Sequence, residues 1–182
     1  MDPFVPIGYF PKDTTVPVGW ADSDRVNEIC SVSDCISSGP KDCIERWIHN
    51  DYGYYNSELD AVSVCGESEI MFRVLAFRMM STVFTSGESA PFAIPEFPIV
   101  PFSPKFKSIG FDVANGSPGR NIIPFLGCSP LSCNGMAREI PVNEFCLLDS
   151  LELAIALAKR FSIGEAEPGP YFVVEILRQP AP

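Results

Sequence analysis

Hydrophobic and polar positions follow their clearest pattern over residues 142–178. Val142–Leu148 and Tyr171–Leu177 are largely apolar runs of strand length, and the apolar residues between them recur at helical spacing. Asp149–Glu152 places acidic residues in the first turn of this helix, and Gly164 is suited to end it. The pattern therefore predicts a strand, a helix and a second strand in that order.

The middle of the chain carries a longer apolar run. Met71–Phe84 is apolar at nearly every position, with Arg73 and Arg78 as its only charges. The glycines that flank the run and the β-prone residues at its end favour a long central strand over a helix. Further on, Ser108–Ala114 is predicted to form a strand and Pro130–Ala137 a short helical turn.

Residues 88–105 are rich in proline and predict a connector. Four of the prolines, Pro95, Pro98, Pro101 and Pro104, recur at a spacing of three, which excludes a helix and suits polyproline II. Two interpretations stay open. The segment either connects two elements and packs its phenylalanines onto the domain, or presents a ridge to an aromatic groove of a partner.

Residues 1–60 predict an irregular, acidic N-terminal part. Prolines interrupt Phe4–Phe10, so any strand there should be short and lie at a sheet edge. Asp22 or Ser23 can cap a short helix that carries Val26–Cys30, and a second helix is expected over Lys41–Asn50.

These elements predict one α+β domain over residues 1–182. Its sheet should be mainly antiparallel or mixed, with a few short helices and many loops and prolines. A length of 182 residues suits a single domain, and a hydrophobic fraction of 46% is that of a globular protein rather than a disordered one.

Charge narrows the classes of function. The net charge is −10, and residues 1–60 hold 11 acidic against four basic residues. This excess of acidic residues disfavours direct binding to nucleic acid or anionic lipid, because such binding relies on Lys and Arg side chains. No apolar run approaches the roughly 18 residues of a membrane span, and the first residues lack a secretory pattern. We therefore expect a cytoplasmic protein that does not enter a membrane.

Two cysteine pairs repeat one pattern, C-S-x-x-x-C. They are Cys30 with Cys35 and Cys128 with Cys133, in a chain of seven cysteines that a reducing compartment would keep as thiols. Four thiolates from two such pairs can hold a tetrahedral zinc ion, the one cofactor that the chain suggests. The alternative is that these cysteines are buried as small apolar side chains.

A cysteine-dependent enzyme is a second hypothesis. Cys128 or Cys133 would be the nucleophile and His49, the single histidine, the base that activates it. Asn134 or Asp149 would then orient the histidine. The alternative places His49 at a helix end, favourably set against the helix dipole. No motif in the chain is specific enough to name a reaction.

Two carboxylates stand in apolar strand settings. Asp112 lies between Phe111 and Val113, and Glu175 between Val174 and Ile176. A pair of carboxylates can perform acid–base chemistry when burial separates their pKa values. The alternative is a solvated strand face, or structural ion pairs with Arg73 and Arg78 on the long central run.

The leading hypothesis is an acidic protein that binds another macromolecule rather than an enzyme. A basic protein is the expected partner, as for immunity proteins, antitoxins and inhibitors, because opposite charge speeds and orients the encounter. The candidate contact carboxylates are Asp22, Asp24 and Glu28, and the candidate contact aromatics are Tyr52, Tyr54 and Tyr55. The tyrosines can also belong to a turn that closes over the core. The oligomeric state stays open.

Overall fold

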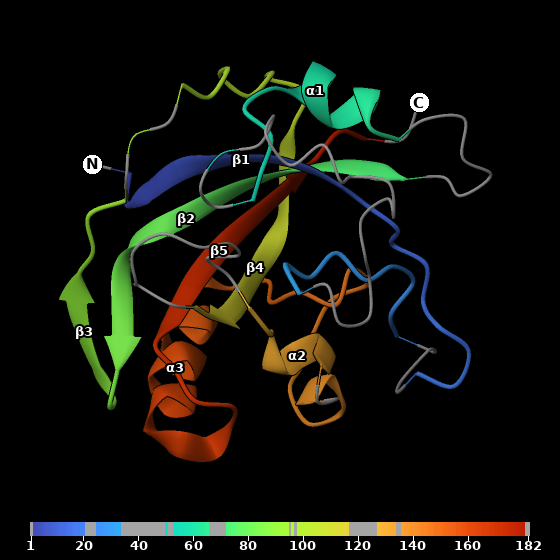
Figure 1. Ribbon diagram of the computed structural model, residues 1–182. Coiled ribbons are helices and arrows are strands. Elements are labelled where there is room, and N and C mark those ends of the chain that lie inside the picture. Colours follow the sequence, from blue (N-terminus) through green and yellow to red (C-terminus); the bar gives the residue numbers. More distant parts are fainter. Residues whose placement is uncertain are drawn as a thin grey trace.

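The computed structural model describes residues 2–20, 25–33, 50, 53–65, 72–94, 96, 98–116, 127–133 and 136–180. The elements follow the chain in the order β1 (Phe4–Lys12), α1 (Glu58–Ser63), β2 (Arg73–Thr85), β3 (Glu88–Pro91), β4 (Lys107–Asn115), α2 (Pro130–Cys133), η2 (Met136–Arg138), α3 (Leu151–Arg160), η3 (Phe161–Glu165) and β5 (Tyr171–Arg178). Figure 1 shows a curved sheet with α2 and α3 at one end and α1 at the other.

The sheet has five strands, and every pair of neighbours in it is antiparallel. Its order is β1-β2-β5-β4, with β3 also paired to β2. β2 is 13 residues long and central, as the apolar run of Met71–Phe84 predicts. β4 and β5 confirm the predictions for Ser108–Ala114 and Tyr171–Leu177. An antiparallel sheet with a few short helices is the α+β architecture expected from the sequence.

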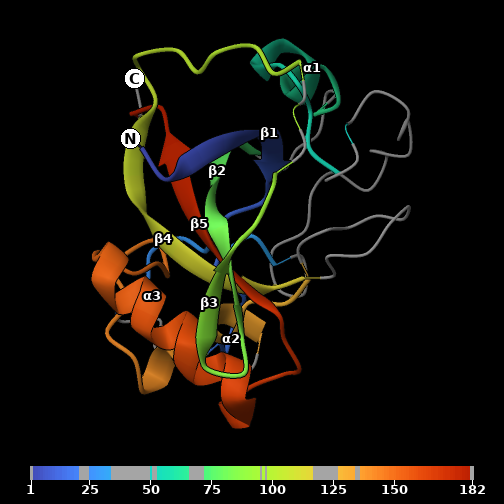
Figure 2. The same ribbon diagram turned by 90° about the vertical axis from the view of Figure 1, so that its left-hand side faces the viewer.

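Both faces of β5 are buried. Phe172 and Val174 point to one face, where they pack in a cluster with Phe77 of β2. Tyr171 and Val173 point to the other face, where they pack against α3. Since successive side chains of a strand alternate between faces, this explains the nearly unbroken apolar run of β5. Figure 2 shows α3 beside the sheet at the end where β3 lies, and α1 at the opposite end.

The helix expected after Asp149 is confirmed as α3. Ser150 is its N-cap and accepts a hydrogen bond from the backbone N–H of Leu153, 3.3 Å away. Three small or apolar residues of α3, Ala154, Leu157 and Ala158, are buried against the sheet. Gly164, with a φ of 105°, lies in the turn that ends the helical stretch.

The prediction of a strand at Val142–Leu148 is wrong. Only a single bridge, between Phe111 and Leu148, joins this segment to β4. The side chain of Asn143 accounts for the difference, because its oxygen accepts hydrogen bonds from the backbone N–H groups of Phe145 and Leu147. These contacts close the segment on itself and leave it unable to extend along β4.

Two expectations for the N-terminal part also need correction. β1 lies at the sheet edge as expected, but it extends over nine residues rather than a short stretch. Prolines are tolerated there because an edge strand need not use every N–H group. No helix forms in the described residues 25–33, since the backbone N–H groups of Asn27 and Glu28 donate to the carbonyl of Glu144. The helix predicted at Lys41–Asn50 lies almost entirely outside the described residues.

The start of the proline-rich connector forms a strand that sequence patterns did not reveal. β3 folds back on β2 through a turn at Ser86 and Gly87, whose φ angles are 52° and 79°. Two consecutive positive φ values are typical of the tight turns that join hairpin strands. Beyond β3, the described residues up to Pro104 form no helix, as the proline spacing predicts. In the part of the chain that the structure describes, no helix is long and apolar enough to cross a membrane.

Candidate functional site

Asp112 forms the centre of a buried polar cluster. Its side chain leaves β4 on the face shared with Val174, and none of the residue is exposed. One carboxylate oxygen accepts hydrogen bonds from the Ser31 hydroxyl at 2.8 Å and the Val32 N–H at 2.9 Å. The other accepts from the Ser129 hydroxyl at 2.6 Å and the Val113 N–H at 2.8 Å. Four donors therefore surround this carboxylate.

The two C-S-x-x-x-C strings meet at this cluster through their serines. Ser31 and Ser129, which follow the first cysteine of each string, both donate to Asp112. Ser132 also donates to the hydroxyl of Ser31 at 2.8 Å. The repeat thus does bring two distant segments together, but the contact at Asp112 is made by hydroxyl groups rather than by thiols.

Lys12 holds the same serine segment from β1. Its side chain is 1% exposed, and its ammonium donates to the carbonyl oxygens of Ser31 at 2.6 Å and Ser33 at 2.8 Å. A buried cation needs such acceptors to offset its loss of hydration. Lys12 and Asp112 therefore anchor residues 31–33 from two edges of the sheet.

The chemistry of this cluster is structural. Burial raises the pKa of Asp112, although the four hydrogen bonds act in the opposite direction. Because Asp112 is fully buried, the cluster fastens residues 31–33 and 129–132 to β4 and presents no reactive group to a substrate. The interpretation that Asp112 lies on a solvated strand face is therefore wrong. Glu175 lies on the other face in an ion pair with Arg78 at 2.8 Å, the structural pairing that the sequence suggested.

The candidate nucleophiles and zinc ligands are only partly placed. Cys128 and Cys133 are half-buried, and the Sγ of Cys133 lies 2.7 Å from the hydroxyl of Ser33. Cys30 is buried, which raises the pKa of its thiol to about 12 and makes it a poor nucleophile. Cys35 and His49 lie outside the described residues, as does Asn134. The described residues contain no group of three possible metal ligands, and both the zinc site and the thiol enzyme stay predictions.

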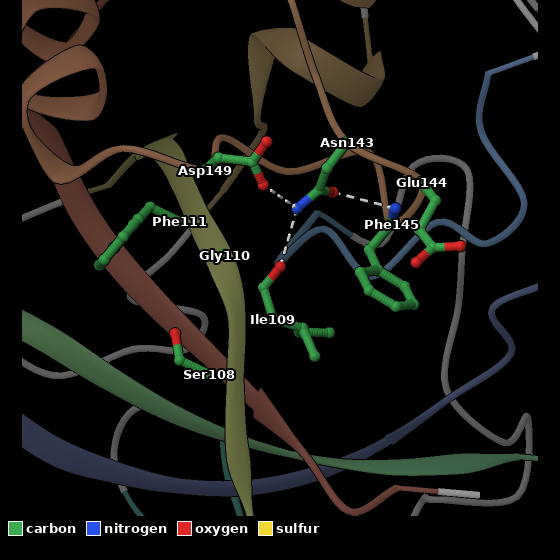
Figure 3. A pocket seen from close by; sticks show the side chains of 8 residues that line it. All are labelled: Ser108, Ile109, Gly110, Phe111, Asn143, Glu144, Phe145 and Asp149. Carbon is green, nitrogen blue, oxygen red and sulfur yellow. Dashed lines mark hydrogen bonds between the residues drawn. The ribbon is translucent and has the colours of Figure 1, made fainter.

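A pocket of about 340 Å³ opens beside β4. The acidic pocket, as we call it, is lined by Ser108, Ile109, Gly110, Phe111, Asn143, Glu144, Phe145 and Asp149. Figure 3 shows Asn143 between Asp149 on one side and Glu144 and Phe145 on the other, with Phe111 and Ser108 across from Phe145. Strand β4 and the loop before α3 therefore build the pocket together.

Asn143 sets the shape of the acidic pocket. Its amide nitrogen donates to the carbonyl of Ile109 at 2.9 Å and to the carboxylate of Asp149 at 2.8 Å, as drawn in Figure 3. The loop can approach β4 closely because Gly110 has no side chain: a Cβ there would lie 2.8 Å from the Cβ of Leu147. Gly110 also has a φ of 140°, a conformation that favours glycine.

Two carboxylates give the pocket its charge. Glu144 and Asp149 are both exposed, and each accepts a hydrogen bond from an asparagine amide. Neither forms an ion pair with a cation within the described ranges. The half-buried rings of Phe111 and Phe145 add apolar walls. The pocket is therefore suited to a cationic group carried on an apolar stem.

The structure places three of the six candidate partner-binding residues. Glu28 pairs with Arg178 at 2.6 Å and accepts from the Thr14 hydroxyl at 2.8 Å. Burial alone would raise the pKa of Glu28, but these hydrogen bonds outweigh it and leave the pKa below its ordinary value. Tyr54 and Tyr55 are buried in the core, which favours the turn that closes over it. Asp22, Asp24 and Tyr52 lie outside the described residues.

Sequence reasoning named Asp149 as an acidic residue at the start of a helix and as a possible orienter of a histidine, and it did not consider Glu144. The pocket depends on the contact of Asn143 with Ile109, 34 residues away, and no local pattern indicates such a contact. A scan against models of protein families, a search among curated proteins and a search among solved structures each find no match to this chain.

Proposed function

We propose that this protein binds a basic protein and that the acidic pocket receives a lysine or arginine side chain of that partner. The observation that carries the proposal is the pair of exposed carboxylates, Glu144 and Asp149, with no cationic partner among the described residues. A partner's ammonium or guanidinium group would supply the missing charge, and its methylene stem would lie against Phe111 and Phe145.

The segment around Glu28 extends this surface. The backbone N–H groups of Asn27 and Glu28 donate to the carbonyl of Glu144 at 2.8 and 3.0 Å, so the segment runs directly beside the pocket. Asp22 and Asp24 precede it in the sequence. The exposed carboxylates of Glu144 and Asp149 would steer a basic partner toward the pocket, an effect that salt weakens.

The test is affinity capture from cells that make the protein, with charge-reversal variants as bait. Glu144→Lys places a cation in the pocket, and it alters an exposed side chain whose one hydrogen bond among the described residues is to Asn27. Glu88→Lys is the matched control, because it makes the same charge change on exposed β3, outside the pocket. We expect a basic protein to be captured by the wild type and by Glu88→Lys, to elute as salt rises, and to be lost with Glu144→Lys.

Equal capture by all three baits would contradict the proposal. So would a partner that is retained at high salt and is indifferent to charge reversal at Asp22 and Asp24. In either case the acidic composition would serve solubility and not recognition.

A further inference from the structure

The proline-rich connector exposes its side chains with a period of three residues. Pro98, Pro101 and Pro104 are exposed, whereas Ile99 and Phe102 are half-buried and pack against a buried cluster of the core. Residues 98–103 belong to no helix or strand, and a turn follows them at Pro104. A polyproline II helix has three residues per turn and no internal hydrogen bonds, so it produces such a pattern. The segment therefore packs one face on the domain and leaves the three prolines, which we call the proline ridge, on the outside.

The backbone beneath the proline ridge is held in place by the rest of the protein. The N–H of Val100 donates to the carbonyl of Asn56 at 2.8 Å. The hydroxyl of Tyr9 donates to the carbonyls of Val100 at 3.1 Å and Pro101 at 3.4 Å. The Tyr9 ring also meets the ring of Phe102 edge-on, with their centres 4.9 Å apart. A partner would therefore meet a ridge that is already ordered, which lowers the entropic cost of binding.

The proline ridge is apolar and is followed by a cation. Figure 2 shows this segment crossing the top of the molecule from α1 toward the start of β4. The side chain of Val100, directly before Pro101, is 52% exposed. Lys105 is exposed and forms no ion pair in the described part of the chain. Residues 98–108 contain no Asp or Glu, so this surface is locally basic on a protein of net charge −10.

We propose that the proline ridge binds an aromatic-lined groove of a partner protein, of the kind that SH3 and WW domains present. Such grooves recognise a polyproline II segment by packing aromatic rings against its prolines. One face of this segment rests on the domain, so the proline face and the adjacent Val100 side chain are left for the groove. Lys105 would lie against an acidic rim of the groove. None of these residues lines the acidic pocket, and this inference does not rest on the proposed function.

The experiment presents the purified full-length protein to a panel of purified SH3 and WW domains. We expect at least one domain to bind saturably in calorimetry. A synthetic proline-rich peptide that occupies the groove of that domain should compete with the protein. The comparison uses the wild-type chain, so it needs no variant to fold.

Variants then locate the contact on this protein. Pro101→Ala removes two methylene groups and the ring that fixes φ, so we expect binding about tenfold weaker. Pro141→Ala, at an exposed proline outside the ridge, is the matched control and should bind as the wild type does. Lys105→Glu should also weaken binding, whereas Lys159→Glu, on exposed positions of α3, should not.

Three results would each overturn the proposal. They are no saturable binding to any domain of the panel, binding that the proline-rich peptide does not displace, and unchanged binding by folded Pro101→Ala and Lys105→Glu proteins. Capture of a basic protein through Glu144 is measured separately, so either proposal can fail alone.

Discussion

At the scale of single residues, Asp112 shows how a buried carboxyl group can specify a fold. Each of its two oxygens accepts one hydroxyl donor and one backbone N–H donor. A hydroxyl can rotate to accept instead of donate, but a backbone N–H cannot. The environment therefore requires an acceptor at both oxygens, and a carboxylate is the only side chain of this shape that provides it.

This requirement predicts the effect of Asp112→Asn. Whichever way the amide is turned, its NH2 group must face a backbone N–H donor, that of Val32 or that of Val113. A buried polar group left without a partner costs about 1–3 kcal/mol, so we expect a loss of at least this size in the free energy of unfolding. Urea denaturation measures it, with Glu139→Gln, an exposed change of the same kind, as control. A stability equal to that of the control would show that the cluster does not need an acceptor at both positions of this side chain.

The sequence pattern predicted that Asp112 lies in a strand, but it did not predict the role of its side chain. Its partners Ser31 and Ser129 lie 81 and 17 residues away, and a lone carboxylate between Phe111 and Val113 also fits a solvated strand face. The repeated C-S-x-x-x-C string was a real signal of contact. The cysteines of the string suggested metal or thiol chemistry, because thiols are better ligands and nucleophiles than hydroxyl groups. In the structure it is the serines of the string that contact Asp112.

At the scale of elements, α3 depends on its cap as well as on its apolar face. The hydroxyl of Ser150 accepts from the N–H of Leu153 and donates to Glu152 at 2.7 Å. Without this cap, one more of the first backbone N–H groups of the helix would lack a protein acceptor. The helix covers the face of the sheet that carries Tyr171 and Val173, so its first turn positions a large part of the core.

Ser150→Ala should therefore lower the free energy of unfolding by about 1 kcal/mol, the usual cost of removing a serine N-cap. Chemical denaturation monitored by far-UV circular dichroism measures the loss. Ser89→Ala, on exposed β3, removes a hydroxyl that does not cap a helix and should be close to neutral. If both variants lost the same free energy of unfolding, the N-cap hydrogen bond would contribute no more to stability than an exposed surface hydroxyl does.

The elements that sequence patterns predicted are those whose signal is local. β2, β4, β5 and α3 each carry an apolar run or stripe along their own length. The segment 142–148 has an equally apolar run, yet the side chain of Asn143 turns it into a loop. β3 was missed for the opposite reason, because all four of its residues are exposed and it has no apolar pattern. Only the turn at Ser86 and Gly87 marks it.

At the scale of the whole molecule, polar contacts connect the N-terminal segment to strands far along the chain. Glu28 pairs with Arg178 across 150 residues, and Ser31 reaches Asp112 across 81. The charge distribution predicted contact carboxylates within residues 1–60, whereas the carboxylates of the acidic pocket, Glu144 and Asp149, lie late in the chain. Lys12, Arg73, Arg178 and Lys107 lie side by side at one end of the sheet. The sequence could not predict this arrangement, because it depends on strand order and register.

The long-range pair between Glu28 and Arg178 predicts how stability changes with pH. The pKa of Glu28 is lower in the folded protein than its ordinary value of 4.5. A depressed carboxyl pKa means that the unfolded chain binds the proton more readily, so the stabilisation is present above pH 4.5 and is lost as the pH falls through the folded value. Asp112 acts in the opposite direction, since its raised pKa makes its contribution decline as the pH rises.

Comparing the wild type with Glu28→Gln isolates the first of these effects, because Asp112 titrates in both proteins. We expect the wild type to have the larger free energy of unfolding at neutral pH, by about 1 kcal/mol or less for a pair that is partly exposed. This advantage should shrink steadily below pH 4.5, where protonation removes the charge of Glu28. Urea denaturation of both proteins across this range measures the difference. An advantage that stays constant as the pH falls would mean that Glu28 stabilises the fold by packing and by its bond to Thr14, and not by its charge.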